Sequence, residues 1–257
     1  MNLNSSLKIL TRSRLFFDAG LILVLLAGMV SARGAATNDF FARGVEFSRE
    51  GQFPEAAAAF AAAAKAQPAV GTLVNLGLAE WQRGHAGTAI LAWEQASWIN
   101  PFDARAAANL KFARQVAQVD APPLKWQEIV STWLPPNVWA WLACVMLCLA
   151  VGLLVLPGIL RWQKAGWHQL LAALAFGIFL LGLTADVGVI SRSHIGFVLK
   201  PNAPLQLTPT QEGEMVSTLA AGEPVRTVRA RGHYIFVRTM AGSGWLHESA
   251  LGLVCPR

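Results

Sequence analysis

The sequence predicts a multidomain membrane protein in which an all-α repeat region, a two-helix membrane hairpin and a small all-β barrel follow one another. Three observations carry this prediction. Small and aromatic residues recur at a fixed spacing in the first half, two long uncharged stretches follow, and short strand-like runs separated by turn residues end the chain. The composition agrees, since 54% of the 257 residues are hydrophobic and only 14% are charged, which is unusual for a soluble chain of this length.

The repeat is visible as pairs of equivalent positions roughly 33 residues apart. The pairs are Gly44 and Gly77, Gly51 and Gly84, Ala56 and Ala89, Phe60 and Trp93, Ala63 and Ala96, and Pro68 and Pro101. Small residues let two antiparallel helices approach closely, glycines interrupt the chain between them and prolines end the second helix. We expect the two aromatic residues to fill the space between neighbouring helix pairs. An Ala-rich bundle without repeat character is the alternative.

This spacing predicts two helix pairs and a solvated capping helix within residues 37–119. The expected helices are Asp39–Glu50, Pro54–Ala66, Thr72–Arg83, Ala86–Ile99 and Ala104–Val119. The motifs NLGLAEWQRG and AILAWEQASWINP resemble the tetratricopeptide repeat, most closely in the second unit. The first unit departs from the family pattern, because Arg43 stands where a leucine is usual.

The resemblance implies that a ligand binds the concave face made by the first helix of each pair. Carried onto this chain, that partner-binding groove consists of Phe41, Val45, Asn75, Leu78, Trp81, Arg105 and Asn109. Its mixture of apolar and polar side chains indicates a peptide surface rather than a pure carboxylate grip. Ordinary packing against the membrane-proximal linker, residues 120–137, is the alternative reading of the same residues.

Two apolar stretches predict transmembrane helices over residues 138–160 and 169–190. The first has about 23 residues without a charge, enough to cross a hydrocarbon core of ~30 Å. The second contains Asp186, which is either a solvated group near the membrane surface or part of a proton or ion path. Tryptophans are expected at both interfaces, where aromatic rings are favoured. They are Trp133, Trp139 and Trp141 at one end and Trp162 and Trp167 at the other, with ordinary packing residues as the alternative.

The N-terminus predicts the orientation. Lys8, Arg12 and Arg14 precede the apolar stretch Ala19–Val30 and a run of small residues, so residues 1–36 read as a signal peptide, with an uncleaved anchor as the alternative. In both cases the repeat region lies outside the cytoplasm, and the turn 161–168 lies inside. We therefore expect a multi-pass protein of the bacterial inner membrane with both soluble domains in the periplasm.

Short runs with turn residues between them predict a closed or nearly closed β-barrel over residues 194–254. The expected strands are Phe197–Leu199, Leu205–Leu207, Glu214–Leu219, Pro224–Val228, Tyr234–Arg238 and Gly244–Leu246. The segments STLAAGEPVRTV and HYIFVRTMAGSGWLHESALG resemble the bacterial SH3-like domain, whereas LQLTPTQEG departs from it. The resemblance implies a module that binds cell-wall peptides or is purely structural. Tyr234, Trp245 and His247 are the candidates for an exposed aromatic surface, with Trp245 in the barrel core as the alternative.

Catalytic and metal sites are not predicted. None of the five histidines has a carboxylate or cysteine at motif spacing, and Cys144, Cys148 and Cys255 match no zinc site. We therefore expect no enzymatic activity, no cofactor and no metal. The net charge of +6 is spread along the chain without a basic run, which makes nucleic acid a poor candidate partner.

The whole order of segments resembles the BatE family, the tetratricopeptide component of the Bacteroides aerotolerance cluster. The local matches are ARAAANLKFARQ before the linker and NVWAWLA at the start of the first span. The resemblance implies an inner-membrane scaffold that acts beside von Willebrand factor A-type membrane proteins and a MoxR-type ATPase, in stress tolerance or envelope-protein assembly. An envelope anchor that binds peptidoglycan through the barrel is the alternative function.

Overall fold

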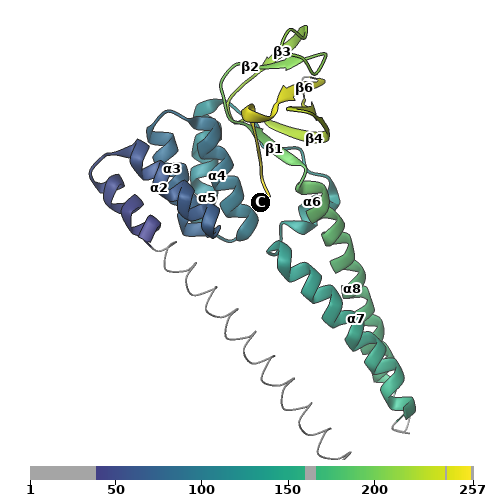
Figure 1. The fold of residues 1–257 in the computed structure, drawn as a ribbon. Helices are drawn as coiled ribbons and strands as arrows, with labels where there is room; N and C mark the ends of the chain where they lie inside the picture. The colour runs from purple at the N-terminus through teal and green to yellow at the C-terminus, as the bar shows by residue number, and fades with distance from the viewer. Residues whose placement is uncertain (1–38, 160–165, 241, 256–257) are drawn as a thin grey trace, which may run out of the picture. The chain divides into compact units, whose positions relative to one another are not determined.

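The computed structural model describes residues 39–159, 166–240 and 242–255 (Figure 1). The predicted signal peptide and most of the predicted turn 161–168, including Trp162, lie outside these residues. The chain divides into two compact units, Met1–Pro68 and Ala69–Arg257. The first contains one described helix pair, and the second contains the remaining helices and the sheet.

The helix pair of the first unit consists of a helix over residues 39–49 and α2, Phe53–Ala66. Gly51 joins them with a φ of 74°, a left-handed conformation that favours glycine. A Cβ on Gly44 would lie 2.7 Å from the Phe60 ring, and Phe60 is 1% exposed. The glycine is therefore what allows the two helices to touch through this aromatic ring.

The second unit repeats this construction in α3, Val70–Gln82, and α4, Ala86–Ile99. Gly84 has a φ of 80°, and a Cβ on Gly77 would overlap the Trp93 indole. The buried indole Nε1 also donates a hydrogen bond to the Val74 carbonyl, at 3.1 Å. The aromatic residue thus packs within its own helix pair, so our expectation that Phe60 and Trp93 fill the space between neighbouring pairs is wrong.

The next helix, α5, spans Ala104–Ala117. Asp103 caps its first turn by accepting hydrogen bonds from the backbone N–H groups of Arg105 and Ala106. Gln118 ends it in the left-handed conformation, with a φ of 53°. The helices of this region begin and end within about two residues of the predicted positions, since glycine, proline and capping residues act locally.

Two helices of the second unit are long and apolar enough to cross a membrane. They are α7, Pro136–Ile159, and α8, Trp167–Arg192. They pack against each other through small residues, and a Cβ on Gly182 would lie 3.2 Å from that of Ala143. Large apolar side chains such as Leu154 and Leu174 point outward and are exposed, as expected for helices that face lipid.

A short helix that the sequence did not predict, α6, Trp126–Ser131, lies in the expected linker and packs against α8. Its packing also explains a wrong prediction about Trp139, which we expected at the membrane interface. Trp139 is only 2% exposed, and its Nε1 donates to the Ser131 carbonyl at 3.3 Å. Trp133 and Trp141 are 55% and 73% exposed, and Trp167 at the other end of the predicted spans is 59% exposed, so these three remain candidates for interfacial side chains.

The C-terminal part of the second unit is a seven-stranded antiparallel sheet with the order β3-β2-β6-β5-β4-β1-β7. Its strands are β1 Ile195–Val198, β2 Ala203–Gln206, β3 Met215–Leu219, β4 Pro224–Arg231, β5 Tyr234–Arg238, β6 Ser243–His247 and β7 Leu251–Leu253. The sequence predicted the first six within a few residues. It missed β7, which follows one turn of 3-10 helix, Glu248–Ala250, and has only three residues.

The sheet curls around one hydrophobic core. Leu219 in β3 and Leu251 in β7 belong to the two edge strands of the pairing order, yet both lie in the same buried cluster. The central strands add Val225, Val237 and Leu246 to that cluster. Edge strands that share a core must be folded toward each other, so the sheet is strongly curved, as the ribbon shows (Figure 1).

Candidate functional site

The predicted groove residues of the second unit lie on two helices, whereas Phe41 and Val45 belong to the first unit. Asn75, Leu78 and Trp81 follow one another at helical spacing in α3, and Arg105 and Asn109 do so in α5. Trp81 connects the two helices, because its ring lies 5.7 Å from that of Phe112 in an edge-on contact. We call this surface the α3–α5 face, and it consists of Asn75, Leu78, Trp81, Arg105, Asn109 and Phe112.

The α3–α5 face presents apolar side chains to solvent. Leu78 is 44% exposed and Phe112 is 55% exposed, whereas Trp81 is half-buried against Trp93, with ring centroids 6.0 Å apart. Phe112 was missed by the sequence reasoning, although it lies one turn after Asn109 and two turns after Arg105. Helical spacing alone could have found it.

Arg105 is occupied locally. Its guanidinium donates to Asp103 Oδ2 at 3.0 Å, and this hydrogen bond, together with one from the Ala106 N–H, lowers the pKa of Asp103. An arginine paired with the cap of its own helix is less available for a ligand carboxylate. The polar side chains of the face therefore offer a ligand less than the sequence suggested, because Arg105 is already paired. The exposed apolar side chains, Leu78 and Phe112, offer more.

The sheet covers one side of α4, the helix between α3 and α5 in the chain. A Cβ on Gly87 would overlap the carbonyl oxygens of Val198 and Leu199, and Cβ atoms on Gly222 and Gly252 would overlap Ile90 and Leu91. Gln95 Nε2 also donates to the Leu253 carbonyl at 2.9 Å. Glycines on both sides thus let α4 and the sheet approach closely, so α4 contacts both the neighbouring helices and the sheet.

The predicted aromatic surface of the sheet is only partly present. Trp245 is 6% exposed and packs on Phe236, with ring centroids 5.3 Å apart, while the Arg229 guanidinium lies 5.3 Å from the Trp245 ring. Trp245 is therefore buried rather than exposed. It lies on the face of β6 opposite the core residue Leu246, and it is covered there by Phe236 and Arg229 instead of by the barrel core. His247 is exposed and contacts the half-buried Tyr234 edge-on at 5.3 Å.

A buried ion pair that the sequence did not reveal joins the sheet to α6. Glu128 is fully buried, and its carboxylate accepts two hydrogen bonds from the Arg226 guanidinium, at 2.7 and 2.6 Å. Ser191 Oγ in α8 and the Lys125 backbone N–H donate to it as well, at 2.5 and 2.7 Å. Segments distant in sequence therefore meet at one carboxylate.

The same contacts determine the protonation state of Glu128. Burial alone would raise its pKa, but the hydrogen bonds from Arg226, Ser191 and Lys125 outweigh burial and lower the pKa to about 2. The carboxylate is consequently ionised at every physiological pH. The donors of these hydrogen bonds belong to β4, to α8 and to the residue before α6. The Glu128 carboxylate therefore holds the sheet, α6 and the end of α8 together.

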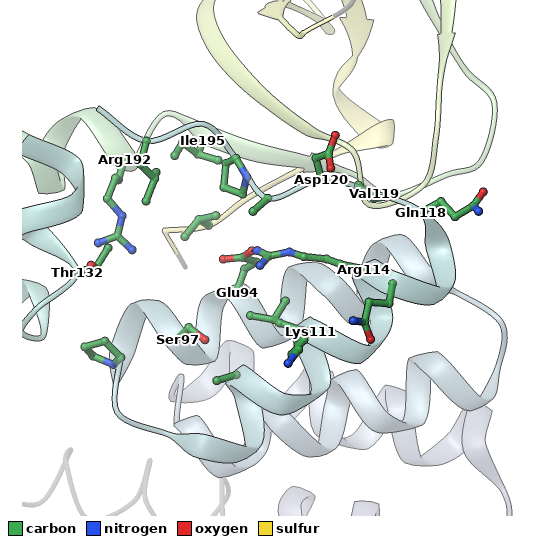
Figure 2. A pocket seen from close by; sticks show the side chains of 18 residues that line it. Glu94, Ser97, Lys111, Arg114, Gln118, Val119, Asp120, Thr132, Arg192 and Ile195 are labelled. Carbon is green, nitrogen blue, oxygen red and sulfur yellow. The ribbon is translucent and has the colours of Figure 1, made fainter. Parts of the chain in front are cut away.

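A cavity of about 890 Å³ lies beside this junction (Figure 2). It is bounded by α4, α5, the segment that follows α5, and the end of α8, and its lining includes Glu94, Lys111, Arg114, Thr132, Arg192 and Ile195. Figure 2 shows Glu94 and Arg114 pointing toward each other, with Arg192 directed toward the same space. Burial raises the pKa of Glu94, although the neighbouring Arg114 and Arg192 oppose this effect.

No family model, curated protein or solved structure matches the chain. Within residues 39–159, 166–240 and 242–255, no group of three histidine, cysteine or acidic side chains is placed to hold a metal ion. Two features of the second unit therefore stand out as candidate sites. They are the exposed α3–α5 face and the charged cavity beside the Glu128–Arg226 junction.

Proposed function

We propose that the protein is a membrane-tethered scaffold that binds other proteins through the α3–α5 face. One observation carries this proposal. Leu78 in α3 and Phe112 in α5 remain exposed on that face, whereas the sheet packs against α4. Neighbouring exposed apolar side chains on a helical surface are typical of sites that take up a partner helix or peptide.

In this proposal the helix pairs are tetratricopeptide repeats, α7 and α8 are transmembrane helices, and the curved sheet is an SH3-like domain. Both soluble domains face the periplasm of a bacterial inner membrane. The protein belongs to a BatE-like assembly for aerotolerance, stress response or envelope-protein assembly. Its partners are von Willebrand factor A-type membrane proteins that act with a MoxR-type ATPase. The repeating Gly77–Trp93 and Gly44–Phe60 contacts support the repeat assignment.

Co-purification from gently solubilised membranes tests the docking role. The double variant Leu78→Glu/Phe112→Ser places a charge and a small polar group on the face, and we expect it to lose the partner that the unchanged chain retains. Both side chains are exposed, so the fold should tolerate the change. The matched control is Leu207→Glu/Met240→Ser, which alters two apolar side chains of the sheet region that are 58% and 73% exposed. Equal recovery with both double variants would refute the assignment of the face.

Protease protection tests the orientation. In spheroplasts, protease added outside should cleave the loops of the sheet, such as the turn around Gly232, while inside-out vesicles should protect them. The reverse pattern would contradict a periplasmic location.

An envelope anchor is the second candidate function. A ring cluster of the half-buried Tyr234 and the exposed His233 and His247 favours it, since the two histidine rings stack 6.2 Å apart and Tyr234 contacts one of them. Under this hypothesis the full-length protein in neutral detergent sediments with purified peptidoglycan, and Tyr234→Ser/His247→Ser reduces the sedimented fraction. Sedimentation that is absent, or that is insensitive to this double variant, would exclude it.

A further inference from the structure

The cavity beside the junction has an excess of positive charge. Three cations, Lys111, Arg114 and Arg192, and two carboxylates, Glu94 and Asp120, line it. Glu94 pairs with Arg114, and the neighbouring Glu128 pairs with Arg226 outside the lining. Among the residues that the structure describes, Arg192 makes no direct ion pair with a carboxylate.

Arg192 retains unused hydrogen-bond donors. Its Nη1 donates one hydrogen bond to Ser131 Oγ, at 3.2 Å, and its guanidinium stacks on the Trp98 ring, with 5.0 Å to the centroid. A guanidinium has five N–H donors, and within the described part of the chain the bond to Ser131 is the one hydrogen bond that the Arg192 side chain makes, while Arg192 lines the cavity. The Nε of Arg114 is likewise buried there without a hydrogen bond to any described residue.

The remainder of the lining is suited to an amphiphile. Leu110, Leu124, Ile195 and Val254 contribute apolar surface, and Lys111 lies among the charged residues that line the cavity. An occupant that combines an anionic group with an apolar body would match both kinds of lining, because the excess charge needs a counter-ion and the apolar wall excludes water.

The cavity lies where both candidate membrane spans end. Arg192 is the last residue of α8, and Thr132 precedes the start of α7 at Pro136. Trp126 and Trp133 are 63% and 55% exposed in the same segment, and exposed tryptophans are typical of the headgroup zone. A headgroup of the adjoining leaflet is therefore the anion with the shortest route to Arg192.

We propose that this cavity binds the phosphate group of an anionic membrane lipid, with Arg192 as the direct contact and with Arg114 and Lys111 adding positive charge. A guanidinium can bind a phosphate through two parallel N–H donors. The proposal rests on the membrane-spanning part of the proposed function and does not depend on partner docking at the α3–α5 face. A free phosphate ion offers the same chemistry and is distinguished by the experiment.

Native mass spectrometry of the full-length protein in neutral detergent measures the binding. We expect phosphatidylglycerol to be retained at least about tenfold more tightly than phosphatidylcholine, whose headgroup carries no net charge. Arg192→Gln should weaken retention of phosphatidylglycerol by about tenfold or more, the effect of one charge-assisted hydrogen bond. Arg192→Lys should retain part of the affinity, because it keeps the charge. Arg231→Gln removes the same charge from an exposed position of β4 and should change nothing.

Several results would overturn the proposal. Equal retention of both lipids, or unchanged retention with Arg192→Gln, would refute the site. Binding of inorganic phosphate that depends on Arg192, without retention of phosphatidylglycerol, would refute the lipid as the source of the anion.

A second variant keeps the test usable if Arg192→Gln fails to fold. Lys111→Gln changes an exposed side chain that does not contact Trp98, and it should lower lipid affinity a few-fold. Partner recovery should stay unchanged in all these variants, which separates this test from that of the docking face.

Discussion

Arg226 in β4 forms a two-point ion pair with Glu128 in α6, although the two residues are 98 positions apart in the chain. Arg226 also donates to the Pro123 carbonyl at 2.8 Å, so one side chain holds both the linker and the short helix against the sheet. Since Ser191 at the end of α8 binds the same carboxylate, this pair connects the sheet to the helices that are apolar enough to cross a membrane.

Breaking this pair should destabilise the protein strongly. Arg226→Met leaves the buried Glu128 charge without its partner, which typically costs about 3–5 kcal/mol. Replacing both residues by methionine should cost less than the single change, because no unpaired charge remains. Chemical denaturation in detergent measures the free energy of unfolding, with Arg231→Met as the control. A single variant as stable as the unchanged chain would contradict the role of the pair.

The pair should also make stability depend on pH in the acid range. The pKa of Glu128 falls from 4.5 to about 2 on folding, so the folded state favours the ionised form. Its contribution is fully present above about pH 4.5 and is lost as the pH falls toward 2, and it corresponds to about 3 kcal/mol. Unfolding free energies measured between pH 5 and pH 2 should decrease by this amount more in the unchanged chain than in Glu128→Gln. Parallel curves for the two proteins would show that the carboxylate does not contribute.

The close contact in the second helix pair gives a prediction with a control on the same helix. Gly77→Ala forces a methyl group into the Trp93 indole and should cost about 1–3 kcal/mol. Gly71→Ala, also in α3, meets no atom within 4 Å and should stabilise by about 0.5 kcal/mol, since alanine favours helix. Thermal unfolding followed by tryptophan fluorescence compares the two variants. The prediction is wrong if Gly77→Ala is tolerated as well as Gly71→Ala.

The two apolar helices contain a similar pair of glycines. Gly182 faces Ala143 at the α7–α8 contact, whereas a Cβ added to Gly177 would meet no atom within 4 Å. Gly182→Leu should therefore separate the helices, while Gly177→Leu should leave the hairpin intact with the same gain in hydrophobicity. Resistance to heat-induced aggregation in detergent is the readout. Equal resistance of both variants would indicate that the helices do not depend on this contact.

Local features of the sequence accounted for much of the fold. The helix boundaries around Gly51 and Gly84 follow from residues that end or join helices, and these act over one or two turns. The strands Tyr234–Arg238 and Ser243–His247 follow from alternation and turn residues in the same way. The three-residue strand Leu251–Leu253 was missed because it is too short to show a period.

The candidate sites were less accessible from the sequence. Leu78 could be placed on an exposed helix face because its helix has a clear period, but Trp139 and Trp245 could not be assigned from residue type. An indole is equally suited to a membrane interface and to a core, and only its neighbours decide between them. Trp139 is buried against α6, and Trp245, on the face of β6 opposite the core residue Leu246, is covered by Phe236 and Arg229.

The sequence by itself determined where most helices and strands begin and end, because those signals depend on neighbours within a few residues. Only the tertiary structure decided which surfaces are covered and which charges meet. Glu128 and Arg226, or Arg192 and its cavity, carry no motif, since a buried ion pair requires only that two distant residues arrive at one place. The repeated glycines predicted close helix contacts, and the structure assigned their partners, Phe60 and Trp93.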